Sequence, residues 1–179
     1  DNVKIVNNET GKVLDKDNFS VPNFWWNWQQ ASNGDWEIKG GKLTQKETAL
    51  PFHDLGSSAY FGDPDWTNYT YTFEAKKLHG EEGFYIPFLI QDNQNMFFWN
   101  IGGWGNTKSS LQRMEKGIKT GEIHETTTDF TVETGRTYNI KIEVTDYIIK
   151  GYIDGELQFE YNPNGENDVF SLSNSLYTL

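Results

Sequence analysis

Acidic side chains are the first candidates for chemistry, because hydrolysis of a glycosidic bond needs two carboxyl groups about 5–9.5 Å apart across a cleft. The expected strands contain no Glu-x-Asp-x-x-Glu spacing that would place such a pair on one face. Glu81 and Glu82 are adjacent and follow Gly80, so their side chains diverge. Asp63-Pro64-Asp65 is typical of a turn. We interpret both groups as solvated acidic turns and keep a glycoside hydrolase as the alternative function.

Histidines and oxygen-rich loops give two further possibilities. His53, His79 and His124 do not accompany a Gly-x-Ser-x-Gly nucleophile elbow, and no His-x-x-x-His pair is present for zinc. Asp15-Lys16-Asp17-Asn18 resembles the alternating oxygen ligands of a calcium loop, although no glycine and distal glutamate complete an EF-hand. This segment is either a structural calcium site or an acidic strand end. We expect no cofactor to be required.

An aromatic segment with polar neighbours indicates a third chemistry, the binding of sugars. Trp and Tyr rings cover the apolar face of a sugar, and Asn, Gln and His supply donors and acceptors for its hydroxyls. Met96–Thr107 combines both kinds, and its glycines leave backbone space around Trp104. The alternative is that these rings fill the core, which is the interpretation we favour for the second cluster, Phe24–Gln29.

Composition excludes several classes of partner. The chain has 179 residues, no cysteine and a formal charge of −11. Nucleic acid and anionic membranes would repel so acidic a surface. No apolar run approaches the roughly 18 residues of a membrane-spanning helix. Aromatic residues make up 16% of the chain although its mean hydropathy is −0.70, which is typical of secreted β-proteins that bind sugars.

The elements that must position these residues are strands. Apolar and polar residues alternate over Tyr69–Lys76 and Thr137–Val144, the period of a half-buried strand. Asp154-Gly155 predicts a two-residue hairpin turn. Further strands are expected at Val3–Val6, Lys12–Asn18, Trp36–Ile38, Lys42–Thr44, Ser57–Tyr60, Gly83–Gln91, Met96–Ile101, Ser109–Met114, Ile118–Thr126, Ile148–Ile153, Glu156–Phe159 and Asp168–Leu172. About a dozen strands predict an all-β, two-sheet antiparallel jelly-roll sandwich. We expect one domain over residues 1–179, cut from a larger protein.

Strand alternation predicts which side chains share a face. If Phe97, Trp99 and Ile101 point into the core, Asn100 points away from it. The same reasoning on the neighbouring strands places Leu111 and Ile123 inside. The outward side chains then form a candidate carbohydrate-binding set with the exposed loop after residue 102: Tyr85, Asn100, Trp104, Asn106, Gln112 and His124. In it, Trp104 and Tyr85 stack on sugar rings, and the amides bind hydroxyls.

The segments that carry a family resemblance are Gly34–Leu43, Trp66–Tyr71, Glu81–Phe84, Phe98–Thr107 and Tyr152–Glu156. Over residues 35–159 the sequence resembles the concanavalin A-like, laminin-G-like β-sandwich module attached to bacterial α-L-arabinofuranosidases of glycoside hydrolase family 51. The first 30 residues, with their tryptophan cluster, depart from that pattern.

The resemblance implies a non-catalytic module that holds an extracellular enzyme on plant cell-wall polysaccharide, with arabinan, arabinoxylan or a related neutral glycan as ligand. The implied partners are that glycan and an appended catalytic domain, and we expect a monomer. A structural spacer that packs on the catalytic domain is a further alternative, in which the exposed aromatics form a protein interface.

Overall fold

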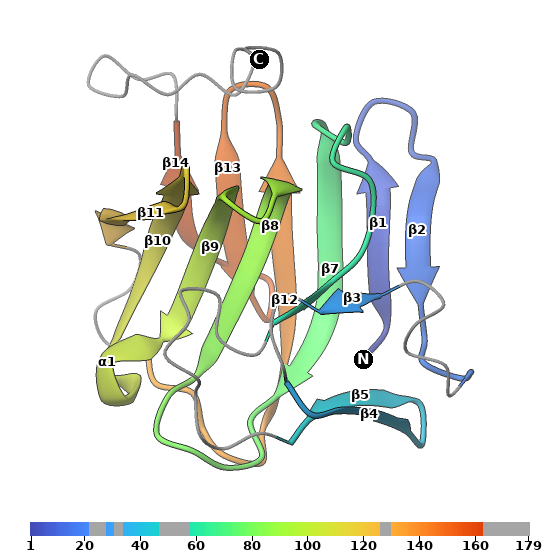
Figure 1. Cartoon of the computed structure of the whole chain (residues 1–179), viewed down its shortest axis with the longest axis vertical. Coiled ribbons are helices and arrows are strands. Elements are labelled where there is room, and N and C mark those ends of the chain that lie inside the picture. Colours follow the sequence, from blue (N-terminus) through green and yellow to red (C-terminus); the bar gives the residue numbers. More distant parts are fainter. Residues whose placement is uncertain (22–27, 31–33, 47–57, 126–129, 163–179) are drawn as a thin grey trace.

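The computed structural model describes residues 1–21, 28–30, 34–46, 58–125 and 130–162. Within them the strands form two stacked antiparallel sheets (Figure 1). The six-stranded sheet has the order β14-β13-β12-β7-β1-β2, with bounds β1 (Val3–Asn7), β2 (Val13–Asp17), β7 (Tyr69–Lys76), β12 (Thr137–Val144), β13 (Ile149–Ile153) and β14 (Glu156–Tyr161). The four-stranded sheet has the order β11-β10-β9-β8, with bounds β8 (Phe84–Asp92), β9 (Asn95–Gly102), β10 (Lys108–Glu115) and β11 (Ile118–Glu125).

Smaller elements connect the two sheets. Two-stranded ribbons pair β3 (Gln29–Gln30) with β6 (Ala59–Tyr60) and β4 (Trp36–Lys39) with β5 (Lys42–Gln45). One short turn, α1 (Gly103–Asn106), follows β9. Among the described residues, no helix has the length and hydrophobicity of a transmembrane span. The predicted two-sheet antiparallel sandwich is confirmed.

The main core lies between the two sheets and follows strand alternation. In β12 every second residue from Tyr138 to Val144 is buried. The facing side chains of the smaller sheet include Phe97, Trp99 and Ile101, as predicted. Trp99 and Phe159 meet edge to face across the sandwich, with ring centroids 5.1 Å apart. Each such side chain stabilises the fold by about 2 kcal/mol through burial.

The six-stranded sheet is wider than the sheet that covers it. In Figure 1, β7, β1 and β2 extend beyond β8, and β3 crosses in front of them. A second cluster fills this region, built on Val3, Phe19 and Trp28, with Phe61 and Tyr71 packed against it. The fold therefore has a side where connecting segments replace the second sheet.

Several turns agree with the sequence. The β13–β14 turn contains Asp154 and Gly155 with φ of 51° and 87°, the left-handed geometry of a tight hairpin. Asn93 and Gln94 connect β8 to β9. Other predictions fall outside the described residues: the aromatic cluster at 24–27, His53, the starting residue 57 of one strand, Thr126 at the end of another, and the strand at 168–172.

Candidate functional site

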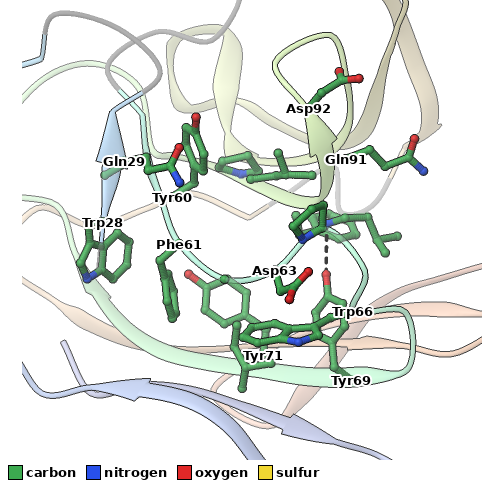
Figure 2. A pocket seen from close by; sticks show the side chains of 18 of the residues that line it. Trp28, Gln29, Tyr60, Phe61, Asp63, Trp66, Tyr69, Tyr71, Gln91 and Asp92 are labelled. Atoms are coloured by element: carbon green, nitrogen blue, oxygen red, sulfur yellow. Dashed lines mark hydrogen bonds between the residues drawn. The ribbon is translucent and has the colours of Figure 1, made fainter. Parts of the chain in front are cut away.

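A cavity of about 270 Å³ lies where the four-stranded sheet ends beside the connecting segments (Figure 2). Its walls come from the end of β8, the β6–β7 connection, β3 and the inner face of β7. Its aromatic lining is Trp28, Tyr60, Phe61, Trp66, Tyr69, Tyr71 and Phe88. Its polar lining is Gln29, Asp63, Gln91, Asp92 and Asn93. The cavity therefore brings together seven aromatic rings and a set of hydrogen-bonding side chains.

The aromatic wall is fixed by ring contacts and by one carboxylate. Phe61 lies between Trp28, at 4.3 Å between ring centroids, and Tyr71, at 6.3 Å. The indole Nε1 of Trp28 donates to Asp17 Oδ2 at 2.9 Å, and the backbone N–H of Phe19 donates to Asp17 Oδ1 at 2.7 Å. Because Trp28 is only 5% exposed, this bond satisfies a donor that water cannot reach. Asp17 therefore sets the orientation of the wall.

The floor of the cavity holds a buried phenol. The backbone N–H of Leu89 donates to Tyr69 Oη at 3.0 Å, and Leu89 has a left-handed φ of 49°. The ladder between β8 and β9 is irregular between Phe88 and Asp92, so this bulge forms part of the wall. Burial raises the pKa of Tyr69 and of Tyr71 well above the usual value. Both phenols therefore stay neutral, and Tyr69 keeps its hydroxyl hydrogen for donation to an acceptor.

One rim is a tight turn at Gly62–Trp66. The N–H of Asp65 donates to Asp63 Oδ1 at 3.0 Å, and the N–H of Trp66 donates to the Asp63 carbonyl at 3.1 Å. Gly62 has a φ of 110°, and a Cβ there would lie 2.8 Å from the Trp66 ring. Glycine is therefore needed both for the backbone and for the close packing of that indole.

The opposite rim is the β8–β9 turn. Asp92 accepts from the Gln94 N–H at 2.7 Å, and the Asn95 amide donates to both of its oxygens at 2.9 Å. The Asp92 carboxylate is therefore committed to closing the hairpin. Like Asp63, it lines the cavity while holding a turn in place.

We interpreted Asp15–Asn18 as either a calcium site or an acidic strand end, and its side chains have partners within the protein. Both oxygens of Asp17 accept the hydrogen bonds described above, Asp15 accepts from the Lys16 N–H at 2.7 Å, and Asn18 accepts from the Ser20 N–H at 3.1 Å. Within the described ranges, no group of three or more Asp, Glu, His or Cys is arranged to hold a metal ion. Calcium binding by this segment stays a prediction.

The pairing of β8, β9 and β10 places three residues of the predicted carbohydrate-binding set on one face of the four-stranded sheet. Tyr85 pairs with Asn100, which pairs with Ser110, and Phe98 pairs with Gln112 one row further along. Directly opposed residues of antiparallel strands share a face, so Tyr85, Asn100 and Gln112 lie together on the side away from the main core. The strands β8, β9 and β10 are therefore adjacent, as the prediction of a shared face required.

The prediction that this face is open is wrong at its centre. Met96, Phe98 and Met114 lie on it and form a third buried cluster, with Phe98 fully buried. Gln112 is only 3% exposed, and its Oε1 is buried with no hydrogen-bond partner among the residues that the structure describes. Tyr85 stacks on Phe98, with ring centroids 4.7 Å apart. The face is closed at its centre, and not open as predicted, because β9 carries apolar side chains on both of its faces.

His124 lies on β11. The ladder pairs its backbone with Leu111, and the register shifts between Leu111 and Gln112. Its outward position stays a prediction. The side chain itself lies outside the part of the chain that the structure describes.

Trp104 and Asn106 lie in α1, at the end of β9. Trp104 is 46% exposed, as predicted. The Asn106 amide instead contacts the backbone: its Nδ2 donates to the Val132 carbonyl at 3.0 Å, and its Oδ1 accepts from the Val132 N–H at 2.8 Å. Asn106 therefore fixes two loops to each other.

Sequence reasoning missed the cavity. Its rim residues Asp63 and Pro64 belong to a segment that we interpreted as a solvated turn, and Trp66 entered only as part of the family resemblance. The available signal was the density of aromatic residues on both sides of that turn, with Tyr60 and Phe61 before it. Alternation within single strands could not reveal it, because the cavity is formed by segments far apart in sequence.

Comparison with known proteins gives two similarities. No protein-family model matches the sequence. Over 129 residues, 72% of this chain, the sequence is 32% identical to an extracellular exo-α-L-arabinofuranosidase of Streptomyces chartreusis, and the chain spans 15% of that protein's length. The predicted resemblance to part of an arabinofuranosidase is thereby confirmed.

The second similarity is structural. The fold matches the carbohydrate-binding module CBM66 from Bacillus subtilis with a TM-score of 0.58 and 18% identity, covering 81% of this chain and 82% of that one. At this identity the match shows a shared β-sandwich fold. The finer predictions, a concanavalin A-like relationship and an attachment to family 51, stay predictions.

Proposed function

We propose that this chain is a non-catalytic carbohydrate-binding module of a glycoside hydrolase, and that the cavity beside β8 is its sugar site. Two similarities support the proposal: one to a region of an extracellular arabinofuranosidase, and one to the fold of a carbohydrate-binding module. Together they favour a secreted protein in which an appended catalytic domain performs hydrolysis and this module binds the glycan.

The lining of the cavity is the observation that carries the proposal. Aromatic rings such as Tyr60 and Trp66 offer apolar surface for the C–H face of a sugar. The Tyr69 hydroxyl supplies a buried donor, and the amides of Gln29 and Gln91 supply donors and acceptors at the rim. Small-molecule sites have this design, in which a mostly apolar cavity carries a few directed polar groups.

The charge favours a neutral ligand. A protein of net charge −11, with Asp63 and Asp92 in the lining, repels an anionic polymer such as polygalacturonate unless a cation lies between them. Arabinan and arabinoxylan are neutral polymers that contain arabinofuranosyl residues, the group that the name of the relative mentions. We therefore propose one of these as ligand, bound by a monomeric module. Calcium is a separate proposal, in which an ion at Asp15–Asn18 supports the fold beside the cavity wall that Asp17 holds through Trp28.

Affinity gel electrophoresis tests the proposal. The panel contains arabinan, arabinoxylan, xyloglucan, galactan and levan, each run with calcium and with chelator. We expect retardation by one neutral polymer. The variants Gln29→Ala and Tyr60→Ala should weaken it at least tenfold, because both side chains line the cavity. Lys4→Ala is the matched control, since Lys4 is exposed on β1 and does not line the cavity.

Three outcomes contradict parts of the proposal. Absence of retardation by every polymer, with tight association to an arabinofuranosidase catalytic domain, indicates the spacer function instead. Turnover of a chromogenic arabinoside by the isolated domain indicates a hydrolase. Full retention of binding by both cavity variants shows that the sugar site lies elsewhere.

A further inference from the structure

The loop that carries Trp104 lies at the other end of the β8–β9 hairpin from the cavity. Phe84, at the start of β8, pairs with Ile101, directly before this loop, whereas Asp92 ends β8 at the cavity rim. At about 3.3 Å per residue, these two ends of β8 are about 25 Å apart. One monosaccharide therefore cannot contact both regions, whereas a polysaccharide can.

The backbone of this loop has an unusual conformation. Trp104, Gly105 and Asn106 have φ of 51°, 71° and 63°, all in the left-handed region. For a residue as large as Trp this region is unfavourable, and it persists only where the surrounding structure enforces it. Glycine would adopt the same φ at position 104 without this cost.

Hydrogen bonds enforce the conformation. The Glu82 carboxylate accepts from the Gly105 N–H at 2.6 Å, and the Thr107 N–H donates to the Gly103 carbonyl at 3.0 Å. The Thr107 hydroxyl donates to the Trp104 carbonyl at 2.8 Å. These bonds come in addition to the two between Asn106 and Val132. Each of these hydrogen bonds involves a backbone group, so the backbone conformation of the loop does not depend on the indole ring.

The ring itself is presented to solvent. Trp104 is 46% exposed, and it belongs to none of the buried clusters formed by the described residues, so those clusters do not explain a tryptophan at this strained position. Lys108 Nζ lies 5.4 Å from the ring centroid, and the side chains of Glu82 and Thr107 hydrogen-bond to the backbone of Gly105 and Trp104. An exposed aromatic face with a cation, a carboxylate and a hydroxyl beside it has the chemistry that sugar rings require.

We propose that the Trp104 loop is a second carbohydrate-contacting platform, so that the module binds one polysaccharide at two separate points. This inference rests on the proposed function, because it takes the same class of ligand. Binding at the cavity raises the effective concentration of the remaining chain at the platform, and the platform thereby strengthens polymer binding without altering the affinity for a short ligand.

The variant Trp104→Gly tests this inference, because glycine removes the ring and suits the left-handed backbone. Trp104→Tyr is the control that keeps an aromatic ring. Isothermal titration measures binding of arabinotriose, which is too short to reach both regions, and affinity electrophoresis measures binding of arabinan. We expect Trp104→Gly to weaken arabinan binding about tenfold, to leave arabinotriose binding unchanged and not to lower the Tm. Trp104→Tyr should retain most of the arabinan affinity.

The outcomes separate the two proposals. Unchanged arabinan binding by Trp104→Gly, with arabinotriose still bound, overturns the second platform and leaves the cavity as the sugar site. An equal loss of arabinotriose and arabinan binding also overturns it, because Trp104 would then act on the cavity. If the wild-type protein binds neither ligand nor any other neutral polymer, the proposed function fails, and the inference fails with it.

Discussion

The cavity and the Trp104 loop fix an aromatic ring in opposite ways. In the cavity, the rings are held by one another and by a side-chain acceptor: Trp28 packs on Phe61 and donates to Asp17. In the loop, the ring is exposed and the backbone beneath it is held by hydrogen bonds. The contrast shows that one tryptophan, Trp28, is buried and holds its surroundings together, whereas another, Trp104, is exposed on a backbone that is held without it. It leads to three predictions, beginning with the largest effect.

Replacing the two tryptophans by alanine should separate these roles most strongly. Trp28→Ala removes a buried indole and leaves Asp17 without one of its donors, so we expect a loss of about 3–5 kcal/mol in the free energy of unfolding. Trp104→Ala should change it by less than about 0.5 kcal/mol, as is usual for surface positions. Urea unfolding monitored by circular dichroism measures both. Similar losses for the two variants would contradict the comparison.

Of the two regions compared, alkaline pH should act on the cavity. Burial holds the pKa of Tyr69 and Tyr71 above the ordinary value of 10 that applies in the unfolded chain. The contribution to stability is therefore fully present below pH 10. It is lost as the pH rises above 10 towards the folded pKa, by up to about 1.4 kcal/mol per pH unit for each group.

Unfolding free energies measured from pH 8 to 11 check this prediction. Tyr69→Phe should give a shallower decline above pH 10, whereas Trp104→Gly should follow the wild-type curve. A decline of the same slope in Tyr69→Phe would show that other groups cause it.

In the loop, the residue that matters for stability should be Asn106. Asn106→Ala removes both bonds to the buried Val132 backbone and places alanine, which tolerates the left-handed region less well than asparagine, at a φ of 63°, so we expect a loss of about 2 kcal/mol. Asn106→Gly keeps the backbone relaxed and isolates the hydrogen-bond contribution. Thermal unfolding measures both variants. If neither lowers the Tm, Val132 finds other partners, and the loop is less rigid than its geometry indicates.

Alternation and turn chemistry made much of the fold predictable. The buried series from Tyr138 to Val144 and the Asp154-Gly155 turn follow directly from local rules, and the facing strands around Trp99 were identified by the same period. These features depend on neighbours close in sequence. The two-sheet architecture follows because so many alternating segments must bury one face each.

The candidate site was less predictable, because its parts come together only in three dimensions. Phe61 and Leu89 are 28 positions apart and meet at the cavity through a bulge that alternation does not foresee. Gln112 is buried because Phe98 and the two methionines of its cluster lie on the same sheet face. We expected that face to be open and polar. Exposure of Trp104 was predictable, since the glycines beside it favour a loop over a strand.

The bulge in β8 has a consequence for self-association. β8 is the last strand of the four-stranded sheet, so its outer edge would normally offer backbone groups to a strand from another molecule. Pro87 lacks an N–H, and the left-handed φ of Leu89 turns the backbone out of the flat geometry that pairing needs. The irregularity that shapes one wall of the cavity thus also blocks sheet extension, and a variant that straightens this strand would gain a template for aggregation.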